Sequence, residues 1–397
     1  MDLILDWLEC SERYTLRNGY EYAYVNVTPA TFRALRVRLI ANGYVEYDSA
    51  ELDQNQFATY IKVNEQANLA YYPTLNGGTL KTVFTQKGYL PLSEPPAYQK
   101  CAIPTVTQLG RIGATFGAAG QLYVIQLEDG SFVLIDGGLD CEEDRKELLR
   151  FLQAKKPAQH AIPRVTWMFT HAHCDHVRLA IQFLNTCADQ IELSLVCRNF
   201  PIFAKENCTV TDNNADHDIK GVALMDQILS EKYPNTPIFE FHSGQRLYLP
   251  GCRVDFLNTH EDCYPTKMWT LNQTSSAWKM SFDGGNSFLV LGDCEIDNCD
   301  QLAAVYHDAL KCNMVQLTHH GLNGGTQALY EKLLPEICFW PIDRARFEGD
   351  VRCLGTYVSK STGRLSYAFN AYLRKICDRH YPADETVTVN TTDLTLM

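Results

Sequence analysis

Three histidines and an aspartate lie within six positions of this chain, in the run Thr170-His171-Ala172-His173-Cys174-Asp175-His176. The protein has only 11 histidines in 397 residues, so this density is not expected of an ordinary polar loop. Imidazole nitrogens and carboxylate oxygens are the ligand types that zinc and other divalent metals bind in proteins. The run therefore predicts a metal site.

The elements on both sides of this run would position its side chains. The apolar segment 165–169 precedes it and has the character of a strand. Side chains alternate along an extended backbone, so His171 and His173 would project to the same side. The segment 177–184 then has the pattern of a helix. The last two residues of the cluster would therefore lie where the strand turns into the helix.

Later in the chain, ligand-type residues again stand at the C-terminal tips of apolar strands. One such tip alone would be weak evidence, because a polar residue after a strand is more often a turn. Several of them on one chain could complete a second metal site beside the first. These positions are His260, Asp293 and the pair His319-His320.

Together, these motifs resemble those of the metallo-β-lactamase superfamily of metal-dependent hydrolases. The resemblance extends over residues 105 to 390, and within it the segment 272–293 is most similar to the ComEC-type hydrolase domain of DNA-uptake proteins. The matching motifs are the His-x-His-x-Asp-His signature at 171–176, the preceding Asp136-Gly137-Gly138, the bridging aspartate in Gly292-Asp293, and the last histidine motif at 319–321.

The resemblance implies a role for each candidate ligand. One ion would be held by His171, His173 and His260, the other by Asp175, His176 and His319, and Asp293 would bridge the two. Asp175 would also accept a hydrogen bond from the nucleophile. His320 would support the ligands from behind or donate a proton.

Two of these assignments stay open. The family's mid-chain histidine usually follows a glycine, but His260 follows a threonine, so His217 and His242 compete with it for this position. His319 is preferred over His320 because it directly follows its strand, as the first histidine of the cluster does. The opposite assignment is also compatible with the sequence.

Two further residues near the cluster have more than one interpretation. Asp136 would either accept a hydrogen bond from a ligand histidine, which fixes the imidazole tautomer, or form part of a plain turn after its strand. Cys174 would be a soft metal ligand, a point of oxidation or a small filler between the ligands.

The order of the predicted elements indicates an α/β fold, an αββα four-layer sandwich of the metallo-β-lactamase type, with a small N-terminal α+β domain. Strands and helices alternate at both ends of residues 101–397, with meandering strands between them, which favours two sheets packed face to face with helices outside. Residues 1–100 form the added domain, whose role the sequence does not reveal. A proline-rich connector near residue 100 marks the predicted boundary.

Composition limits the classes of function that fit the chain. Its 46% hydrophobic and 21% charged residues are ordinary for a globular protein with a sizeable core. The first nine residues carry acids where a signal peptide has basic residues, and no apolar run approaches the roughly 18 residues of a membrane span. We therefore expect a cytoplasmic protein with reduced cysteines. The net charge of −12 disfavours a nucleic-acid-binding surface.

These observations lead to a functional prediction. Two divalent ions, zinc first and manganese or iron as alternatives, would lie about 3.5–4 Å apart and generate hydroxide near neutral pH. The ComEC-like middle segment favours hydrolysis of a phosphodiester in a small-molecule substrate. The alternatives are a thioester or lactone hydrolase, an iron-dependent redox enzyme and a non-catalytic metal-binding protein. The oligomeric state stays open.

Overall fold

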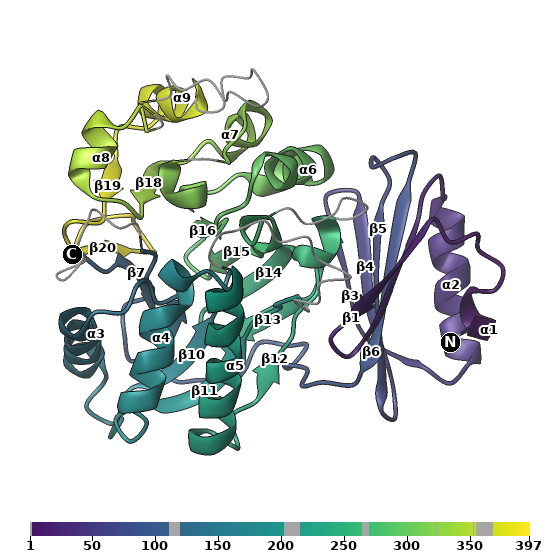
Figure 1. Cartoon of the computed structure of the whole chain (residues 1–397), viewed down its shortest axis with the longest axis horizontal. Coiled ribbons are helices and arrows are strands. Elements are labelled where there is room, and N and C mark those ends of the chain that lie inside the picture. Colours follow the sequence, from purple (N-terminus) through teal and green to yellow (C-terminus); the bar gives the residue numbers. More distant parts are fainter. Residues whose placement is uncertain are drawn as a thin grey trace.

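The computed structural model describes residues 2–110, 120–201, 215–263, 270–322, 324–351, 353–354 and 368–397. Their strands form a six-stranded sheet near the N-terminus and two seven-stranded sheets in the remainder of the chain. Figure 1 shows the N-terminal sheet at one end of the molecule and the two larger sheets, with their helices, at the other. None of the described helices is both long enough and apolar enough to cross a bilayer.

The N-terminal sheet is antiparallel throughout, in the order β1-β2-β6-β5-β4-β3. Helix α2 covers one face and buries Phe32, Leu35 and Leu39 against it (Figure 1). The helix begins at a proline after a threonine N-cap and ends before Asn42-Gly43. The elements are α1 (Asp2–Leu5), β1 (Glu12–Leu16), β2 (Gly19–Tyr24), α2 (Pro29–Ala41), β3 (Val45–Leu52), β4 (Asn55–Lys62), β5 (Glu65–Tyr72) and β6 (Thr79–Gln86).

The second sheet has the order β12-β11-β10-β9-β8-β7-β20. Its strands β9 to β12 are parallel, so their carboxyl ends lie at one edge. The strands are β7 (Thr105–Gln108), β8 (Tyr123–Gln126), β9 (Phe132–Ile135), β10 (Arg164–Met168), β11 (Glu192–Cys197), β12 (Ile238–Phe239) and β20 (Val387–Asn390).

The third sheet has the order β13-β14-β15-β16-β17-β18-β19, antiparallel from β13 to β16 and parallel from β16 to β19. Its parallel half therefore also gathers the carboxyl ends of its strands at one edge. The strands are β13 (Arg246–Leu249), β14 (Cys252–Asn258), β15 (Ala277–Phe282), β16 (Ser287–Val290), β17 (Met314–Gln316), β18 (Ile337–Trp340) and β19 (His380–Pro382).

The two seven-stranded sheets pack face to face through a buried core that includes Tyr123, Met168, Phe256, Trp278 and Phe339. Helices α3, α4 and α5 pack on the outer face of the second sheet, and α6, α7 and α9 pack on that of the third (Figure 1). The predicted αββα sandwich is thus confirmed. The helices are α3 (Glu142–Lys155), α4 (Cys174–Thr186), α5 (Ala215–Lys232), α6 (Ile296–Tyr306), α7 (Gln327–Leu333), α8 (Arg344–Gly349) and α9 (Ala368–Ile376).

The N-terminal sheet contacts the sandwich at the turn that follows β14. Lys81 is buried and donates to the carbonyl oxygen of Glu261 at 2.7 Å. The hydroxyl of Tyr72 donates to Oδ1 of Asp262 at 3.0 Å. A buried cation is costly unless it is paired and hydrogen-bonded, and Asp262 lies 3.7 Å from the Lys81 ammonium. These contacts fix the turn against the sheet. The predicted boundary near residue 100 stays a prediction.

Candidate metal centre

Six side chains of metal-ligand type converge where the carboxyl ends of strands from the two large sheets meet. They fall into two groups, and within each group one ligand atom per residue lies within 4.8 Å of the others. The first group is His171, His173 and Asp293, and the second is Asp175, His176 and His320.

The histidine cluster is positioned by the passage from β10 to α4. Strand β10 ends at Met168, the chain bends at Thr170, and His173 is the N-cap residue of α4. As the alternation predicts, Nε2 of His171 lies 3.0 Å from Nδ1 of His173. Asp175 and His176 follow in the first helical turn. Four candidate ligands thus come from one local stretch of chain.

Asp293 lies between the two groups. It follows β16 through Gly292, which has a φ of 53° and packs so closely that a Cβ there would lie 2.8 Å from Cβ of Thr170. The carboxylate of Asp293 lies 3.2 Å from Nε2 of His176, 3.4 Å from Nε2 of His320 and 3.9 Å from Nε2 of His171. The carboxylate of Asp293 therefore lies close to nitrogens of both groups.

The polar atoms of this cluster fit a pair of metal ions. Nε2 of His176, Nε2 of His320 and Oδ1 of Asp293 are buried without a well-aligned hydrogen-bond partner among the described residues. Buried polar groups are rarely left in this state. Nδ1 of His320 donates to the carbonyl oxygen of Pro341 at 3.1 Å, so in the neutral ring its Nε2 presents a lone pair to the cluster. Nitrogen and carboxylate ligands suit zinc, manganese and iron.

Asp136 fixes the orientation of the cluster from behind. Its carboxylate accepts from Nδ1 of His176 at 2.8 Å, from the Thr170 backbone nitrogen at 2.8 Å and from Nε2 of Gln121 at 2.9 Å. The residue is fully buried, with a φ of 56°. Of the two interpretations left open by the sequence, the structure supports the hydrogen-bond acceptor, because the bond to His176 turns its Nε2 toward Asp293.

We expect Asp136→Asn to lower metal affinity about 10- to 100-fold, the usual effect of losing a carboxylate behind a ligand histidine. Competition with a chelator would measure the change. Asp53→Asn is a matched control, because Asp53 also accepts from a histidine, His307 at 2.7 Å, but on the exposed surface. Equal metal affinity in the Asp136 variant and the wild type would contradict this role.

The electrostatics of the cluster favour a cation. Burial lowers the pKa of His176, but the carboxylates of Asp293 and Asp136 more than offset this, so its pKa lies well above the ordinary value. Burial likewise opposes protonation of His320, yet Asp293 and Asp175 raise its pKa to about 9. Burial raises the pKa of Asp293, but the neighbouring imidazoles hold it well below its usual range. The ionised carboxylates therefore call for buried positive charge, which divalent ions would supply.

The structure places His320, not the preferred His319, with Asp175 and His176. Strand β17 ends at Gln316, and both histidines then adopt left-handed backbone conformations, with φ of 48° and 59°. The simple alternation of a strand therefore does not apply to this pair. His320 is buried, with Nε2 at 3.2 Å from Asp175. His319 stays at the edge, with Nε2 3.8 Å from Asp293 and its side chain 19% exposed.

His260 lies outside both groups. It begins a short 3-10 turn after β14, and its Nε2 donates to Oδ1 of Asn199 at 3.0 Å. Its competitor His242 belongs to the same neighbourhood, since its Nδ1 donates to Glu261 at 2.8 Å. The Lys81 and Tyr72 contacts of the N-terminal sheet anchor this turn, which explains why a histidine at a strand tip does not reach the cluster. The side chain of His217 lies outside the described residues.

We expect His260→Ala to leave the metal content unchanged and to lower the free energy of unfolding by about 1–3 kcal/mol, because the buried Asn199 oxygen loses its donor. Elemental analysis and urea denaturation would measure the two quantities. Loss of one metal equivalent in this variant would instead restore His260 to the ligand set.

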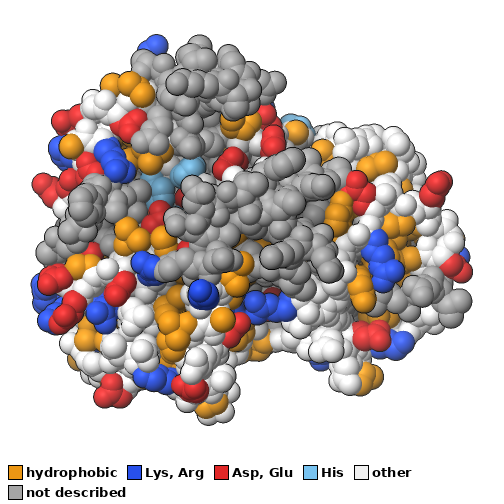
Figure 2. Space-filling model, viewed as in Figure 1, with side chains coloured by type: hydrophobic (Ala, Val, Ile, Leu, Met, Phe, Trp, Pro, Cys, Tyr) orange, Lys and Arg blue, Asp and Glu red, His pale blue; other side chains and the backbone are white. Residues whose placement is uncertain are grey.

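One side of the cluster is accessible. Figure 2 shows histidine side chains in a hollow on the face that Figure 1 presents. The side chain of Asp175 is 27% exposed. Asn272, to which motif analysis did not assign a role, is buried beside this edge, with Nδ2 3.4 Å from Nε2 of His319. Its Oδ1 has no hydrogen-bond partner within the part of the chain that the structure describes. Cys174 belongs to neither ligand group, and burial raises the pKa of its thiol, which disfavours metal ligation.

The fold and site define a four-layer αββα protein with two clustered groups of metal-ligand side chains. No family model matches the sequence, and no curated protein matches it. Similar solved structures include CmlA, a diiron β-hydroxylase from Streptomyces venezuelae (12% identity, TM-score 0.41, 75% of this chain and 55% of that one). They also include unliganded yeast PDE1 (10% identity, TM-score 0.39, 72% of this chain and 99% of that one). A third is a metallo-β-lactamase family protein from Thermus thermophilus (18% identity, TM-score 0.27, 47% of this chain and 58% of that one).

The chain thus spans about half the length of CmlA, 55%. The neighbours differ in their named chemistry, so they leave metal and reaction open. Closeness to the ComEC type stays a prediction from the sequence.

Proposed function

We propose that this protein is a dinuclear metal-dependent hydrolase that cleaves a phosphodiester or a related ester in a small-molecule substrate. The observation that carries the proposal is the place of Asp293, whose carboxylate lies within 3.9 Å of ligand nitrogens from both groups. A carboxylate so placed can join two ions into one centre. The open edge at Asp175 and His319 distinguishes the cluster from a closed structural site, which has no room for substrate.

When bound, a pair of divalent ions lowers the pKa of water and polarises the oxygen under attack. The protein's own residues orient the imidazoles of the candidate ligands. Asp136 holds the imidazole of His176 and itself accepts a hydrogen bond from the hydroxyl of Thr170, and the carbonyl oxygen of Pro341 holds the imidazole of His320. Asp175 is the one partly exposed carboxylate among the six candidate ligands. It is therefore placed to accept a hydrogen bond from the attacking water and to orient it.

His319 and Asn272 form the polar wall of the open edge. Burial lowers the pKa of His319 to about 4, so near neutral pH its imidazole is uncharged and acts as a hydrogen-bond donor or acceptor rather than as a cation. The amide of Asn272 brings a second donor to the same edge. We infer that His319 and Asn272 together bind an oxygen atom of the substrate.

The phosphodiester assignment rests on the ComEC-like segment 272–293, in which Asn272 and Asp293 stand at the two ends. The decisive experiment is a substrate panel on protein reconstituted with zinc, manganese or iron: bis(p-nitrophenyl) phosphate, an acyl thioester and a lactone. Metal content is measured on the same samples. Asp293→Asn and metal-free protein serve as controls for contaminating hydrolases.

We expect metal-dependent turnover of the phosphodiester that exceeds turnover of the thioester and lactone. Faster cleavage of either of those would overturn the phosphodiester assignment while leaving the hydrolase in place. No hydrolysis of any panel member at two ions per chain would overturn the hydrolase. An oxygen-consuming reaction of the iron form would then take its place.

A further inference from the structure

A groove lies between helices α4 and α5, which Figure 1 shows side by side on the face that carries the hollow of the metal centre in Figure 2. Its volume is about 350 Å³, within the range of small-molecule sites. Side chains of α4, of α5 and of the loop after β9 line it, and none of them is among the six candidate ligands. The groove is thus a feature that the metal centre does not account for.

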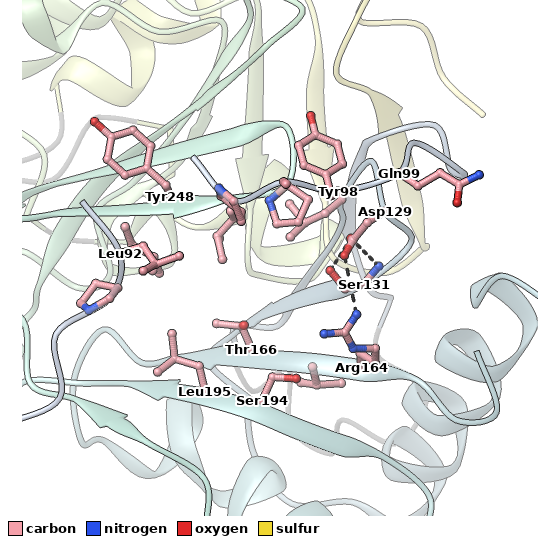
Figure 3. Close-up of a pocket in the computed structure, with 18 of the residues that line it drawn as sticks. Leu92, Tyr98, Gln99, Asp129, Ser131, Arg164, Thr166, Ser194, Leu195 and Tyr248 are labelled. Atoms are coloured by element: carbon pink, nitrogen blue, oxygen red, sulfur yellow. Dashed lines mark hydrogen bonds and ion pairs between the residues drawn. The ribbon is translucent and has the colours of Figure 1, made fainter. Parts of the chain in front are cut away.

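A larger cavity, of about 520 Å³, lies near the amino ends of β10 and β11 and shares no lining residue with the groove. Three of its polar side chains interact with one another. Asp129 accepts from the hydroxyl of Ser131 and lies 3.9 Å from the guanidinium of Arg164 (Figure 3). The rings of Tyr98 and Tyr248 point away from the space (Figure 3). The groove therefore offers more to a ligand than this cavity does.

The groove begins beside the metal centre. Cys174 lines it, and this residue stands between the candidate ligands His173 and Asp175 at the start of α4. The lining residues of α4 recur every three or four positions from Cys174 to Gln182, so they lie along one side of the helix. Over these eight residues the helix rises about 12 Å, at 1.5 Å per residue. A substrate held at the centre can therefore extend a substituent along this side of α4.

The apolar part of the lining is aliphatic. Val177 and Ile181 of α4 are buried, with 1% and 2% of their surface exposed, whereas Leu224 of α5 remains 39% exposed. The thiol of Cys174 adds a small group of apolar character. A hydrocarbon chain that covers Leu224 would remove apolar surface from water on both partners, which favours binding.

Gly221 keeps the groove open on the side of α5. It stands inside this helix, where glycine is a poorer helix former than alanine. Among the described residues, the atom nearest to a Cβ at this position would be Cδ1 of Ile181, at 3.7 Å, which is an ordinary contact. Alanine would therefore fit, so the packing of α5 on α4 does not require a glycine here. The missing side chain leaves space beside Ile181.

The charged side chains of the lining balance one another. Asp140 and Asp218 carry two formal negative charges, and Arg178 and Lys220 carry two formal positive charges. Asp140 also pairs with Arg145 at 3.0 Å. The described lining thus has no net formal charge that would favour an ionic group, and selection rests on its aliphatic part.

We propose that this groove binds an uncharged aliphatic chain of the substrate, which lies along α4 while the ester group is held at the metal centre. The proposal rests on the proposed function and narrows its substrate class to esters with an apolar substituent. Each methylene buried against Val177, Ile181 and Leu224 strengthens binding, so the affinity should rise with the length of the chain.

The first test measures binding of the chain apart from the reaction. n-Octanol is titrated into the full-length, metal-loaded protein and followed by ligand-observed NMR. Gly221→Phe fills the groove with a ring, and Leu224→Asp replaces an apolar wall by a charge at a partly exposed position. Ala223→Phe is the matched control for the ring, because Ala223 is exposed and lies about 200° around α5 from Gly221.

The second test compares two phosphodiesters that differ only in their alkyl group, methyl p-nitrophenyl phosphate and octyl p-nitrophenyl phosphate. We expect the KM of the octyl ester to be at least tenfold lower than that of the methyl ester. Gly221→Phe should remove this difference and leave the KM of the methyl ester unchanged, because the short ester does not reach the groove. Ala223→Phe should keep the difference.

In the titration, we expect octanol to bind equally to the wild type and to Ala223→Phe, and at least fivefold more weakly to Gly221→Phe and Leu224→Asp. If Gly221→Phe does not fold, Leu224→Asp decides in both tests. No octanol binding, or equal binding in the groove variants, would overturn the proposal whether or not the protein is a hydrolase. Octanol binding with equal KM values for the two esters would overturn the assignment of the chain to the substrate. No hydrolysis of either ester would instead contradict the proposed function, and the octanol titration would still decide whether the groove binds an aliphatic chain.

Discussion

Asp293→Asn should reduce the metal content from two ions per chain to at most one and lower phosphodiester hydrolysis by at least about 10³-fold. The reason is geometric. The carboxylate lies 3.2 Å from His176, 3.4 Å from His320 and 3.9 Å from His171, so its oxygens approach ligand nitrogens from both groups. An amide has nearly the same shape but lacks the charge that offsets two divalent cations. Elemental analysis and initial rates measure the two effects.

The control for Asp293→Asn is Asp297→Asn, four residues farther along and exposed in the first turn of α6. It removes the same charge from the same segment without touching the cluster, so metal content and rate should equal those of the wild type. Circular dichroism and the melting temperature establish that both variants fold. A folded Asp293 variant that keeps two ions and full activity would refute the bridging role.

Local chemistry explains how much of the centre could be predicted. His171, His173, Asp175 and His176 follow one another through a single strand-to-helix passage, so their spacing alone places them together. The strand before Asp293 and the glycine next to it are equally local signals. Because parallel strands align their carboxyl ends, residues at such tips can be expected to meet even when far apart in sequence.

The remaining site residues depend on backbone geometry that the sequence pattern does not encode. Which of His319 and His320 joins the ligand group depends on the left-handed backbone conformation of both residues. This conformation is uncommon outside glycine. The position of the His260 side chain depends on partners distant in sequence, namely Asn199 and the turn that Lys81 contacts. A buried lysine on a strand gives no local sign of the turn that it contacts 180 positions later.

The same distinction holds for the fold. The apolar segment 165–169 predicts strand β10 within a residue of its bounds. The edge strands β1 and β3 have alternating exposed and partly buried residues rather than apolar runs, so their pairing depends on the neighbouring strand.

His320→Ala should lower the metal content and His319→Ala should not, although the two residues are adjacent. His320 is buried, its Nδ1 is bound to Pro341, and its Nε2 lies 3.2 Å from Asp175. Its removal should therefore cost one ion per chain and lower the rate by about 10²- to 10³-fold, as expected when part of the charge-stabilising centre is lost. In His319→Ala both ions should remain, because neither ligand group includes this imidazole.

The effect of His319→Ala should appear in the steady-state kinetics rather than in the metal content. A side chain that holds a substrate oxygen at the open edge contributes to binding, so we expect KM to rise with both ions still present, and Asn272→Ala to act in the same direction. Elemental analysis and Michaelis–Menten kinetics on the three variants separate the roles. If His319→Ala loses an ion while His320→Ala keeps two, the ligand assignment is reversed in favour of the simple strand alternation. If both variants lose one ion, each imidazole is a ligand, and the edge has no histidine left for substrate.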